Sequence, residues 1–435
     1  MISVDDHLAQ ILAEIQPLGP VELSLAEAEG AVLAEDVTAA HPLPSFDNSA
    51  MDGFAVRSAD VAGADGEHPV SLPVAAEIAA GDTGDYTVSA GTCARITTGA
   101  RLPAGADAIV PVEWTDGGSP GPGGTPGADG TPGGGTPGGG TPGAEGGSAK
   151  VTIRRAPEPG HAIRCRGEDL REGGTVLSSG TRLGPPQLGL LAASGRGTAT
   201  VRPGPRIAVF STGNELAPPG TPVVPGRIWD SNSYMLAAAA RQAGFTSWRR
   251  EAVADDPAAL VAAIEAQAAQ ADALITSGGV SMGGEHDVVK DVLSRAGSVH
   301  FGKVAMHPGS PQGFGMISGP AGPVPIFTLP GNPVSAYVSF RIFVVPALNA
   351  MQGMETPPPL LIPARLTGPL NSPAGRRSFL RGQLASGDDG PEVTPLSGQG
   401  SHQLASLARA NAFIVVPEQV TDMAEGDIAN VMSLP

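Results

Sequence analysis

The sequence has few aromatic residues, few lysines and few cysteines. Aromatic side chains make up 4% of the 435 residues, whereas hydrophobic residues of all kinds make up 41%. Alanine, valine, leucine and isoleucine must therefore fill most of the core. Only Lys150, Lys290 and Lys303 are lysines, so arginine carries nearly all of the basic charge. The two cysteines, Cys93 and Cys165, lie far apart, which excludes a disulfide framework and a thiolate metal site.

A targeting segment and a membrane segment are also missing. The first residues, Met1 to Asp6, show no basic region followed by an apolar stretch. No run of about 18 apolar residues occurs. The net charge of −17, from 43 acidic and 26 basic residues, disfavours nucleic acid and anionic membranes as partners. We therefore expect a cytoplasmic protein that binds neither nucleic acid nor a membrane, and whose phosphate sites are locally basic.

One low-complexity segment stands out. From Gly117 to Gly147, 22 of 31 residues are glycine or proline, without the strict period of collagen. Such a segment buries almost nothing, and we predict a disordered insertion. Strand-like runs on either side, 108–114 and 150–155, favour an enlarged hairpin loop over an interdomain linker.

The chain is long enough for about two to four domains. Between about 205 and 350, strands and helices alternate, which indicates a mostly parallel sheet covered by helices. Residues 356–435 return to short strands and turns and predict a small β domain. The strands expected in the α/β part are 206–210, 273–276, 299–306 and 326–329, and the helices are 233–242, 256–270, 287–295 and 333–349.

Three of these strands end in glycine-rich turns. In such sheets ligands bind beyond the carboxyl ends of the strands, where glycines let backbone N–H groups face an anion. Three such loops in one domain favour a phosphate-bearing ligand, although tight turns need glycine for packing alone. No Walker or dinucleotide-binding motif is present. The loop residues expected to bind are Ser211, Thr212 and Gly213, then Ser277, Gly278, Gly279 and Ser281, then Pro330, Gly331, Asn332 and Ser335.

Carboxylates gather at loop positions and helix starts. Each fits a solvated side chain or a helix cap, and Asp256 and Asp287 are good cap candidates. Together, facing a phosphate-rich ligand, they suggest Mg²⁺. The carboxylates concerned are Asp52, Glu168, Asp169, Glu215, Asp255 and Asp287.

Six ordered blocks resemble the molybdopterin molybdenumtransferase family, which includes the C-terminal domain of gephyrin. The insertion has no counterpart in the family pattern. The blocks are Pro44 to Arg57 (PSFDNSAMDGFAVR), Arg95 to Ala100 (RITTGA), Ile163 to Asp169 (IRCRGED), Phe210 to Leu216 (FSTGNEL), Ser277 to Gly283 (SGGVSMG) and Leu329 to Ala336 (LPGNPVSA).

The resemblance implies an elongated homodimer of four-domain chains. The implied reaction combines adenylylated molybdopterin with molybdate to give molybdenum cofactor and AMP, with Mg²⁺ assisting. A molybdopterin adenylyltransferase and acceptor molybdoenzymes are expected further partners. The expected parts are an N-terminal helix (1–20) packing with the α/β domain, a linker domain (21–45 and 158–203), a mixed α/β domain carrying the insertion (46–157), an α/β molybdopterin-binding domain (204–350) and a C-terminal β-barrel-like domain (351–435).

The resemblance also implies roles for individual residues. Asp52, Thr98, Glu168, Asp169 and Lys303 are expected to be catalytic, with Lys303 on the phosphates. His307, Arg381 and Ser401 join the loop residues, Glu215, Asp255 and Asp287 in binding substrate. The expected metal ligands are Asp52, Glu215, Asp255 and Asp287.

Two departures from the family pattern bear on function. The family often has lysine where His307 and Ser310 stand. Loss of a cation from an anion site costs roughly 1–3 kcal/mol if that cation contacts the anion, and a protonated His307 recovers part of it. We predict an active molybdenum insertase. The alternatives are a weakened paralogue that acts as a pterin-binding or scaffold protein, and a paralogue that inserts tungstate.

Overall fold

In the computed structural model the chain forms two compact units. The first unit is Met1–Glu35, Ser178–Leu188 and Gly197–Pro435; the second is Asp36–Leu177 and Gly189–Arg196. The expected linker domain is thereby divided between the two. The structure describes residues 1–117, 149–222, 224–280, 288–295, 299–320 and 322–435.

The largest element of the first unit is a six-stranded sheet. Four of its strands, β16, β13, β17 and β21, are parallel neighbours, and β20 and β18 extend the sheet with antiparallel pairing. The predicted mostly parallel sheet is confirmed. In sheet order the strands are β16 (Thr246–Arg249), β13 (Arg206–Ser211), β17 (Ala273–Ser277), β21 (Gly322–Leu329), β20 (Pro311–Gly319) and β18 (Val299–Lys303).

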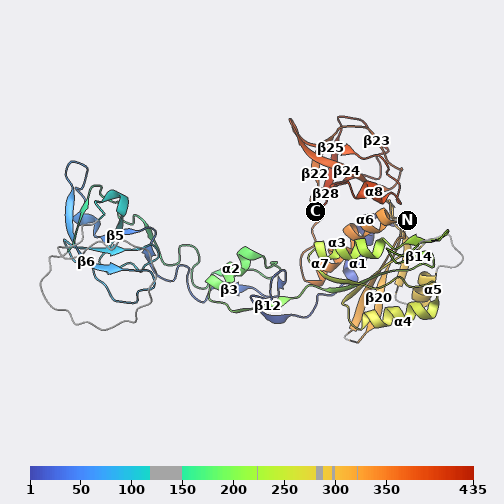
Figure 1. The fold of residues 1–435 in the computed structure, drawn as a ribbon, viewed down its shortest axis with the longest axis horizontal. Helices are drawn as coiled ribbons and strands as arrows, with labels where there is room; N and C mark the ends of the chain where they lie inside the picture. The colour runs from blue at the N-terminus through green and yellow to red at the C-terminus, as the bar shows by residue number, and fades with distance from the viewer. Residues whose placement is uncertain (118–148, 223, 281–287, 296–298, 321) are drawn as a thin grey trace. The chain divides into compact units, whose positions relative to one another are not determined.

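Helices cover both faces of this sheet (Figure 1). Side chains alternate along each strand, so β13 sends Ile207 and Val209 into one core and Ala208 and Phe210 into the other. The first core also contains side chains of α1 (Val4–Glu14), α3 (Asn232–Gln242), α6 (Pro333–Ser339) and α7 (Val345–Met351). The second contains those of α4 (Pro257–Ala268) and α5 (Val288–Arg295). As predicted, Asp256 caps α4, accepting a 2.8 Å hydrogen bond from Ala259 N.

The predicted long helix after Pro333 is continuous but changes its winding. A π-helical segment, η3 (Phe340–Val344), joins α6 to α7. Pro346 lacks an N–H group and crowds the preceding turn, which accounts for the wider winding. The stretch Pro333–Met351 is long and apolar enough to cross a membrane, with a mean hydropathy of 1.4, but 67% of it is buried in the unit. It therefore serves as a core helix.

The C-terminal part is a small closed β-barrel. Strands β24, β25, β22, β28 and β26 pair in that order, and a further pairing of β26 with β24 closes the ring. The predicted β-barrel-like domain is confirmed. The remaining elements are α8 (Leu404–Leu407) and the pair β23 (Leu370–Asn371) and β27 (Asp422–Met423). The barrel strands are β22 (Ile362–Leu366), β24 (Arg377–Gly387), β25 (Gly390–Pro395), β26 (Ala412–Val416) and β28 (Ile428–Ser433).

One segment of the α/β part joins the barrel, contrary to prediction. The expected strand 299–306 ends at Lys303, and Met306–His307 form a separate strand, β19. This strand runs parallel to β24, with His307 opposite Ser378. Val304, Ala305 and Met306 continue an apolar alternation, so local pattern alone does not reveal the change of sheet.

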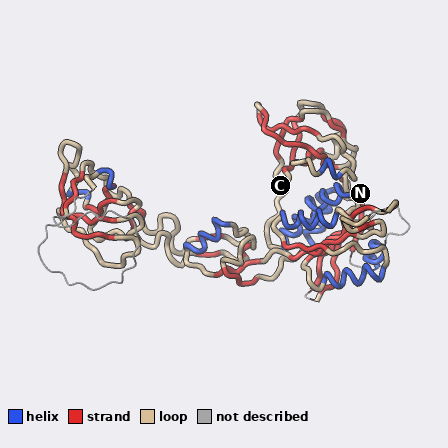
Figure 2. The backbone as a smooth tube through the Cα atoms, viewed as in Figure 1, coloured by secondary structure: helices blue, strands red, loops and turns tan. Residues whose placement is uncertain are grey.

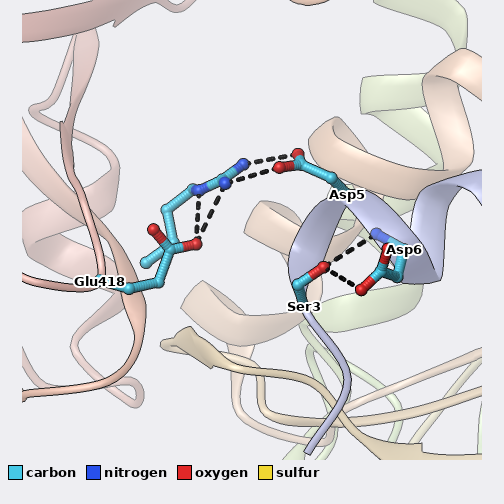
Figure 3. Close-up of polar contacts among 5 residues, drawn as sticks. Ser3, Asp5, Asp6 and Glu418 are labelled. Carbon is cyan, nitrogen blue, oxygen red and sulfur yellow. Dashed lines mark hydrogen bonds and ion pairs between the residues drawn. The ribbon is translucent and has the colours of Figure 1, made fainter.

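An arginine ties the N-terminal helix to the barrel (Figure 3). Both terminal nitrogens of Arg377, on β24, donate to the Asp5 carboxylate of α1 at 2.7 and 2.8 Å. Its Nε donates to Glu418 at 3.1 Å. Ser3 caps the same helix, accepting from Asp6 N. Because Arg377 begins the strand that carries Arg381, this contact helps to hold that strand.

Replacement of Arg377 by alanine is expected to lower the thermal midpoint by a few degrees at pH 7.5. Exposed ion pairs contribute about 0.2–1 kcal/mol, and this one lies at the upper end because it is bidentate and shared. Arg377 lowers the pKa of Asp5, so the stabilisation is present above the ordinary aspartate pKa and is lost as the pH falls through the lowered one. Differential scanning fluorimetry at pH 7.5 and pH 3 tests this. Arg101→Ala is the control, because its single 3.4 Å contact with Asp85 is exposed. A deficit in Arg377→Ala that is as large at pH 3 as at pH 7.5 would contradict the role of Asp5.

Smaller sheets complete the first unit and begin the second. In the first unit, β1 (Val21–Ser24), β12 (Thr198–Arg202) and β2 (Val32–Leu33) form an antiparallel sheet, and β14 (Leu216–Ala217) pairs with β15 (Ile228–Trp229). In the second unit, β3 (Val37–Thr38) pairs with β11 (Thr175–Leu177), and β4 (Asn48–Ser49) pairs with β10 (Ile163–Arg164). Helix α2 (Pro185–Ala193) has residues in both units.

A mixed five-stranded sheet forms the core of the second unit (Figure 2). Short 3₁₀ helices, η1 (Ser58–Asp60) and η2 (Val112–Trp114), follow β5 and β8. The sheet order is β8 (Ala108–Pro111), β5 (Gly53–Val56), β7 (Cys93–Ile96), β6 (Val70–Ile78) and β9 (Lys150–Ile153).

The flanks of the insertion pair, but not through the two expected strands. β8 and β9 lie at opposite edges of the sheet. The pairing is made further along, by Thr115 opposite Ile153 and by Arg154 N donating to Trp114 O at 2.9 Å. The hairpin prediction therefore holds for 114–116 and 152–154 and is wrong for the strands themselves. The insertion lies mostly outside the described residues.

Candidate active site

The three glycine-rich loops meet at one edge of the main sheet. Ser211 lies opposite Ser277 and Ser277 lies opposite Leu329 in the parallel register, so the loops leave the sheet side by side. β18 runs in the same direction as β21, because two antiparallel pairings separate them. Lys303, the last residue of β18, is therefore at this edge as well. The sequence-predicted loops and Lys303 are brought to one end of the fold.

Glycine is required where these loops touch. Gly278 has a φ of +101°, and a Cβ there would lie 2.4 Å from the Thr212 carbonyl oxygen. Gly213 has a φ of +150°, and a Cβ there would lie 2.4 Å from a Glu215 carboxylate oxygen. The Thr212 backbone leaves no room for a side chain at Gly278, so this glycine allows the first two loops to approach each other closely. At Gly213 the positive φ, and not the movable Glu215 side chain, favours glycine.

Two of the expected ligand hydroxyls are used inside the protein. The Ser211 hydroxyl donates to Asp230 at 2.7 Å, and the Ser277 hydroxyl donates to the Pro330 carbonyl at 3.0 Å. Asn232 Nδ2 donates to Ser277 Oγ at 2.8 Å and to Gly331 O at 2.6 Å. These bonds lock the loops to one another and to the start of α3.

A hollow of about 80 Å³ lies between these loops and the β14–β15 pair. Its polar atoms are not all satisfied. Thr212 Oγ1 and Asn232 Oδ1 are buried, and neither has a hydrogen-bond partner among the described residues. A buried polar atom without a partner is costly, and a ligand that supplies one removes that cost. The hollow is lined by Ser211, Thr212, Glu215, Leu216, Ile228, Trp229, Asp230, Ser231, Asn232, Ser277, Gly278, Gly331 and Pro333.

Of the described acidic residues that are expected to bind substrate or metal in this unit, only Glu215 lines the hollow. This residue is exposed. Asp255 is exposed, and its Oδ2 accepts from Asn214 N at 3.1 Å, next to Glu215 in the chain. Ser281 and Asp287, both predicted to be site residues, lie outside the described residues.

A buried guanidinium lies in the barrel. The Arg381 side chain is fully buried, and burial lowers its pKa to about 10. Its Nη2 donates to the carbonyls of Gly398 and Gly400, at 2.5 and 3.1 Å, but Nε and Nη1 have no partner among the described residues. A buried cation with unused N–H groups has the donors and the charge that an anion would need there.

The loop from Gly398 to Ser401, which binds the Arg381 side chain, also contacts the third glycine-rich loop. Asn332 Nδ2 donates to Ser401 Oγ at 3.0 Å, and Val334 N donates to Ser401 O at 3.0 Å. Ser335 is buried, and its carbonyl accepts from Ser339 Oγ at 2.8 Å. Within the first unit, the predicted residues of the barrel and the α/β part are thus in contact.

His307 lies half-buried at the junction of these parts. Burial lowers its pKa, and the positive charges of Arg376 and Arg381 lower it further. The imidazole is therefore mostly neutral at neutral pH, and an anion bound nearby would favour its protonation. Lys303 is exposed.

Asp52 and Thr98 meet in the second unit. They flank β5 and β7, in which Gly53 lies opposite Ile96. Asp52 Oδ1 accepts from Thr98 N at 2.7 Å and from Thr98 Oγ1 at 2.9 Å. The backbone bond, the hydroxyl bond and the charge of Arg95 lower the pKa of Asp52. Oδ2 accepts no hydrogen bond from the described residues and faces outward, so the carboxylate is exposed, ionised and half free.

Glu168 and Asp169 follow a turn that packs on the Asp52 segment. β4 pairs with β10, and the Asp47 carboxylate accepts from Arg166 N at 2.6 Å. One oxygen of Glu168 is engaged as well, because Oε2 accepts from Cys165 N at 2.9 Å. Ser49 N donates to Ala100 O at 3.0 Å. Three of the six sequence blocks therefore meet in this unit.

The expected magnesium ligands are divided between the two units. Asp52 belongs to the second, and Glu215 and Asp255 belong to the first. In the described part of the chain no three His, Cys, Asp or Glu side chains are grouped as a metal site. Mg²⁺ needs no such cage, since one or two carboxylates plus substrate phosphates suffice. Asp52 in the second unit and Glu215 in the first are each exposed, so either carboxylate by itself fits that requirement.

Three residues of the hollow, Asp230, Asn232 and Trp229, were not predicted from the sequence. The first two are buried at the entry to α3, where Asp230 accepts from Ser211 Oγ, Ser233 N and Ser233 Oγ. The run Asp230-Ser231-Asn232-Ser233 before a helix is typical of capping residues, and the sequence predicts only a helix that begins at Ser233. A run of four polar residues after Ile228-Trp229 is the available signal.

Comparison with known proteins identifies the class of this fold. A structure titled as a molybdopterin biosynthesis MoeA protein from Pyrococcus horikoshii is 29% identical and superposes with a TM-score of 0.75, covering 100% of this chain and 99% of its own. Three family descriptions match in order. They are the MoeA N-terminal region (domain I and II) at residues 2–195, a probable molybdopterin binding domain at 208–350 and the MoeA C-terminal region (domain IV) at 363–434.

Curated relatives give the family. The Mycobacterium tuberculosis protein named molybdopterin molybdenumtransferase 2 is 42% identical over 100% of both chains. The Bacillus subtilis molybdopterin molybdenumtransferase is 33% identical over 99% of this chain and 94% of its own. This chain belongs to the molybdopterin molybdenumtransferase family, and it is a transferase of molybdenum cofactor biosynthesis.

Proposed function

We propose that this protein inserts molybdate into adenylylated molybdopterin and releases AMP, with Mg²⁺ assisting, as a homodimer. The reaction makes two demands. An oxygen nucleophile must open the phosphoanhydride, and an oxyanion must be held where it can meet the dithiolene sulfurs. Both steps gather negative charge in a chain whose net charge is already −17, so local cations must offset it.

The observation that carries the proposal is Arg381. Its Nε and Nη1 groups are buried without partners among the described residues, and Ser401 and Asn332 are bonded close by. A guanidinium N–H group that has no partner in the described part of the protein can donate to an oxyanion such as molybdate. The Gly398–Ser401 loop, whose carbonyls bind Nη2, covers the guanidinium. We propose that this loop opens to admit the oxyanion.

The hollow and Asp52 support the other part of the proposal, which is binding of the substrate and opening of its phosphoanhydride. Thr212 Oγ1 and Asn232 Oδ1 offer unused hydrogen-bonding groups to a polar substrate, and Lys303 lies at the same sheet edge. The ionised Asp52 carboxylate, steadied by Thr98, can orient an attacking oxygen or hold Mg²⁺. Mg²⁺ on Asp52 or Glu215 would neutralise charge on the phosphates.

Single-turnover AMP release from adenylylated molybdopterin tests the proposal. With Mg²⁺ present, we expect molybdate to accelerate AMP release and the product to activate an apo-molybdoenzyme. Tungstate in competition measures the preference between the two oxyanions. AMP release that is insensitive to both oxyanions would contradict insertion.

A weakened, substrate-binding paralogue is the second candidate. The observation in its favour is His307, whose lowered pKa leaves less positive charge beside Arg381 than a lysine would. Tight binding of the adenylylated substrate without cleavage would establish this candidate. Activity that rises in His307→Lys would show that the substitution limits, but does not abolish, insertion.

A further inference from the structure

Ile228 and Trp229, called here the Ile228–Trp229 shelf, are exposed apolar residues that line the hollow. They are 58% and 52% exposed, although both belong to a strand. The parallel pairing of β15 with β14 sets Ile228 opposite Leu216 and Trp229 opposite Ala217. Large apolar side chains exposed beside unsatisfied polar atoms indicate a ligand surface.

The indole of Trp229 is held in place but not covered. Its Nε1 donates to the Thr221 carbonyl at 2.9 Å, which fixes one edge of the ring. In the described chain no aromatic ring or cation lies over it. Nearby Arg227 is engaged elsewhere, donating to the carbonyls of Asn214 and Leu216. A ring that is immobilised and left open is prepared for stacking.

The other two tryptophans and Tyr234 have their rings covered or buried. Tyr234 is covered by the Arg249 guanidinium at 4.1 Å. Trp114 stacks on His161 at 4.8 Å and carries Arg155 at 4.0 Å. Trp248 is partly buried in the second core, and its Nε1 donates to Gln267. Among these four rings, the open face therefore belongs to Trp229.

We propose that the Ile228–Trp229 shelf stacks the fused bicyclic nitrogen heterocycle of the substrate, while Thr212 and Asn232 bind its polar groups. This rests on the proposed function, whose substrate contains two such rings, a purine and a pterin. A rigid indole can stack on either a purine or a pterin, but it gains no stacking energy from a ligand that lacks an aromatic ring. The shelf thus makes Trp229 a specificity residue for aromatic ligands over phosphates or sugar phosphates alone.

Intrinsic fluorescence measures the contact directly. The chain has three tryptophans, so Trp114→Phe combined with Trp248→Phe leaves Trp229 as the single emitter. We expect saturable quenching, after inner-filter correction, with AMP or with pterin, and none with ribose 5-phosphate. Quenching by AMP only assigns the purine to the shelf, and quenching by pterin only assigns the pterin. The proposal is overturned if ribose 5-phosphate quenches as strongly as AMP or pterin does, or if neither AMP nor pterin quenches.

Calorimetry on the otherwise unaltered chain separates this proposal from the proposed function. Trp229→Ala is expected to weaken binding of the quenching ligand about ten-fold, as for loss of one stacked base, and Trp229→Phe by much less. The affinity for ribose 5-phosphate should not change, and this result would show that the polar residues of the hollow, Thr212 and Asn232, are undisturbed. Trp248→Phe is the matched control. Equal affinity in Trp229→Ala overturns the shelf alone, whereas absence of AMP and pterin binding in the unaltered chain contradicts the proposed function.

Discussion

Replacement of Arg381 by methionine is expected to reduce molybdate-dependent AMP release by about 10- to 100-fold. A charge-assisted hydrogen bond contributes roughly 1.5–3 kcal/mol, and the bond that an unused group, Nε or Nη1, would make to the oxyanion is lost together with the charge. Methionine keeps the apolar stem and about the same space within the barrel. Single-turnover AMP release across a molybdate series measures the loss as weakened molybdate dependence.

The free energy of unfolding of Arg381→Met is not expected to fall along with its activity. Burial lowers the pKa of Arg381 to about 10, so the charged form costs folding free energy at neutral pH, and this cost disappears only above the ordinary arginine pKa. Removal of the charge therefore removes a penalty, which offsets loss of the bonds to Gly398 and Gly400. Molybdate should raise the thermal midpoint of the unaltered protein but not that of Arg381→Met.

Arg365→Met provides the matched control for Arg381→Met. Arg365 lies on the same barrel, in β22, but it is exposed and makes one long contact, 3.5 Å, to the Gly426 carbonyl. Its replacement should leave AMP release and its molybdate dependence unchanged. If Arg381→Met retained normal molybdate dependence, or if Arg365→Met lost it, the barrel guanidinium would not be the oxyanion site.

The sequence was sufficient for the α/β sheet because its strands have two buried faces. The run Ile207-Ala208-Val209-Phe210 is apolar at every position, and only a strand covered by helices on both sides requires this. The glycine loops were predictable for a similar reason. Gly278 has a backbone conformation and a close contact that only glycine allows, and its place after a strand follows from the sheet topology.

The sequence was insufficient where distant segments determine a residue's surroundings. Arg381 sits in a strand with ordinary alternation, and its burial arises only when β24 closes on β26 and the Gly398–Ser401 loop covers it. His307 gains its environment because Met306–His307 leaves the α/β part to pair with β24. Asp230 shows a third limit, since a capping residue and a buried network carboxylate have the same local sequence. In each case a long-range contact, and not the local pattern, decides the chemistry.

Asp52→Asn is expected to lower AMP release by about 100-fold or more, the usual contribution of a catalytic carboxylate. The amide keeps the shape of the carboxylate and can still accept from Thr98 N, but it has no charge with which to orient a nucleophile or bind Mg²⁺. Asp65→Asn is a close control. Asp65 is also in the second unit, and it accepts from the backbone N–H groups of Glu67 and His68 at 2.8 and 2.6 Å, but it lies outside the six sequence blocks. Its replacement should leave the rate unchanged.

Thr98→Val separates the charge of Asp52 from its position. The hydroxyl of Thr98 stabilises the ionised Asp52, so its removal raises the pKa of Asp52 towards the ordinary value, while the backbone bond from residue 98 remains. If ionised Asp52 is the active form, the rate falls as the pH drops through this pKa. The acid limb of the AMP-release profile should therefore move to higher pH in Thr98→Val, with a nearly unchanged rate at alkaline pH. A uniform loss of rate at every pH would show that Thr98 acts directly on the substrate.

An unchanged rate in Asp52→Asn would remove this carboxylate from the mechanism and leave Glu168 and Asp169, in the adjacent turn, as the remaining acidic candidates of the second unit.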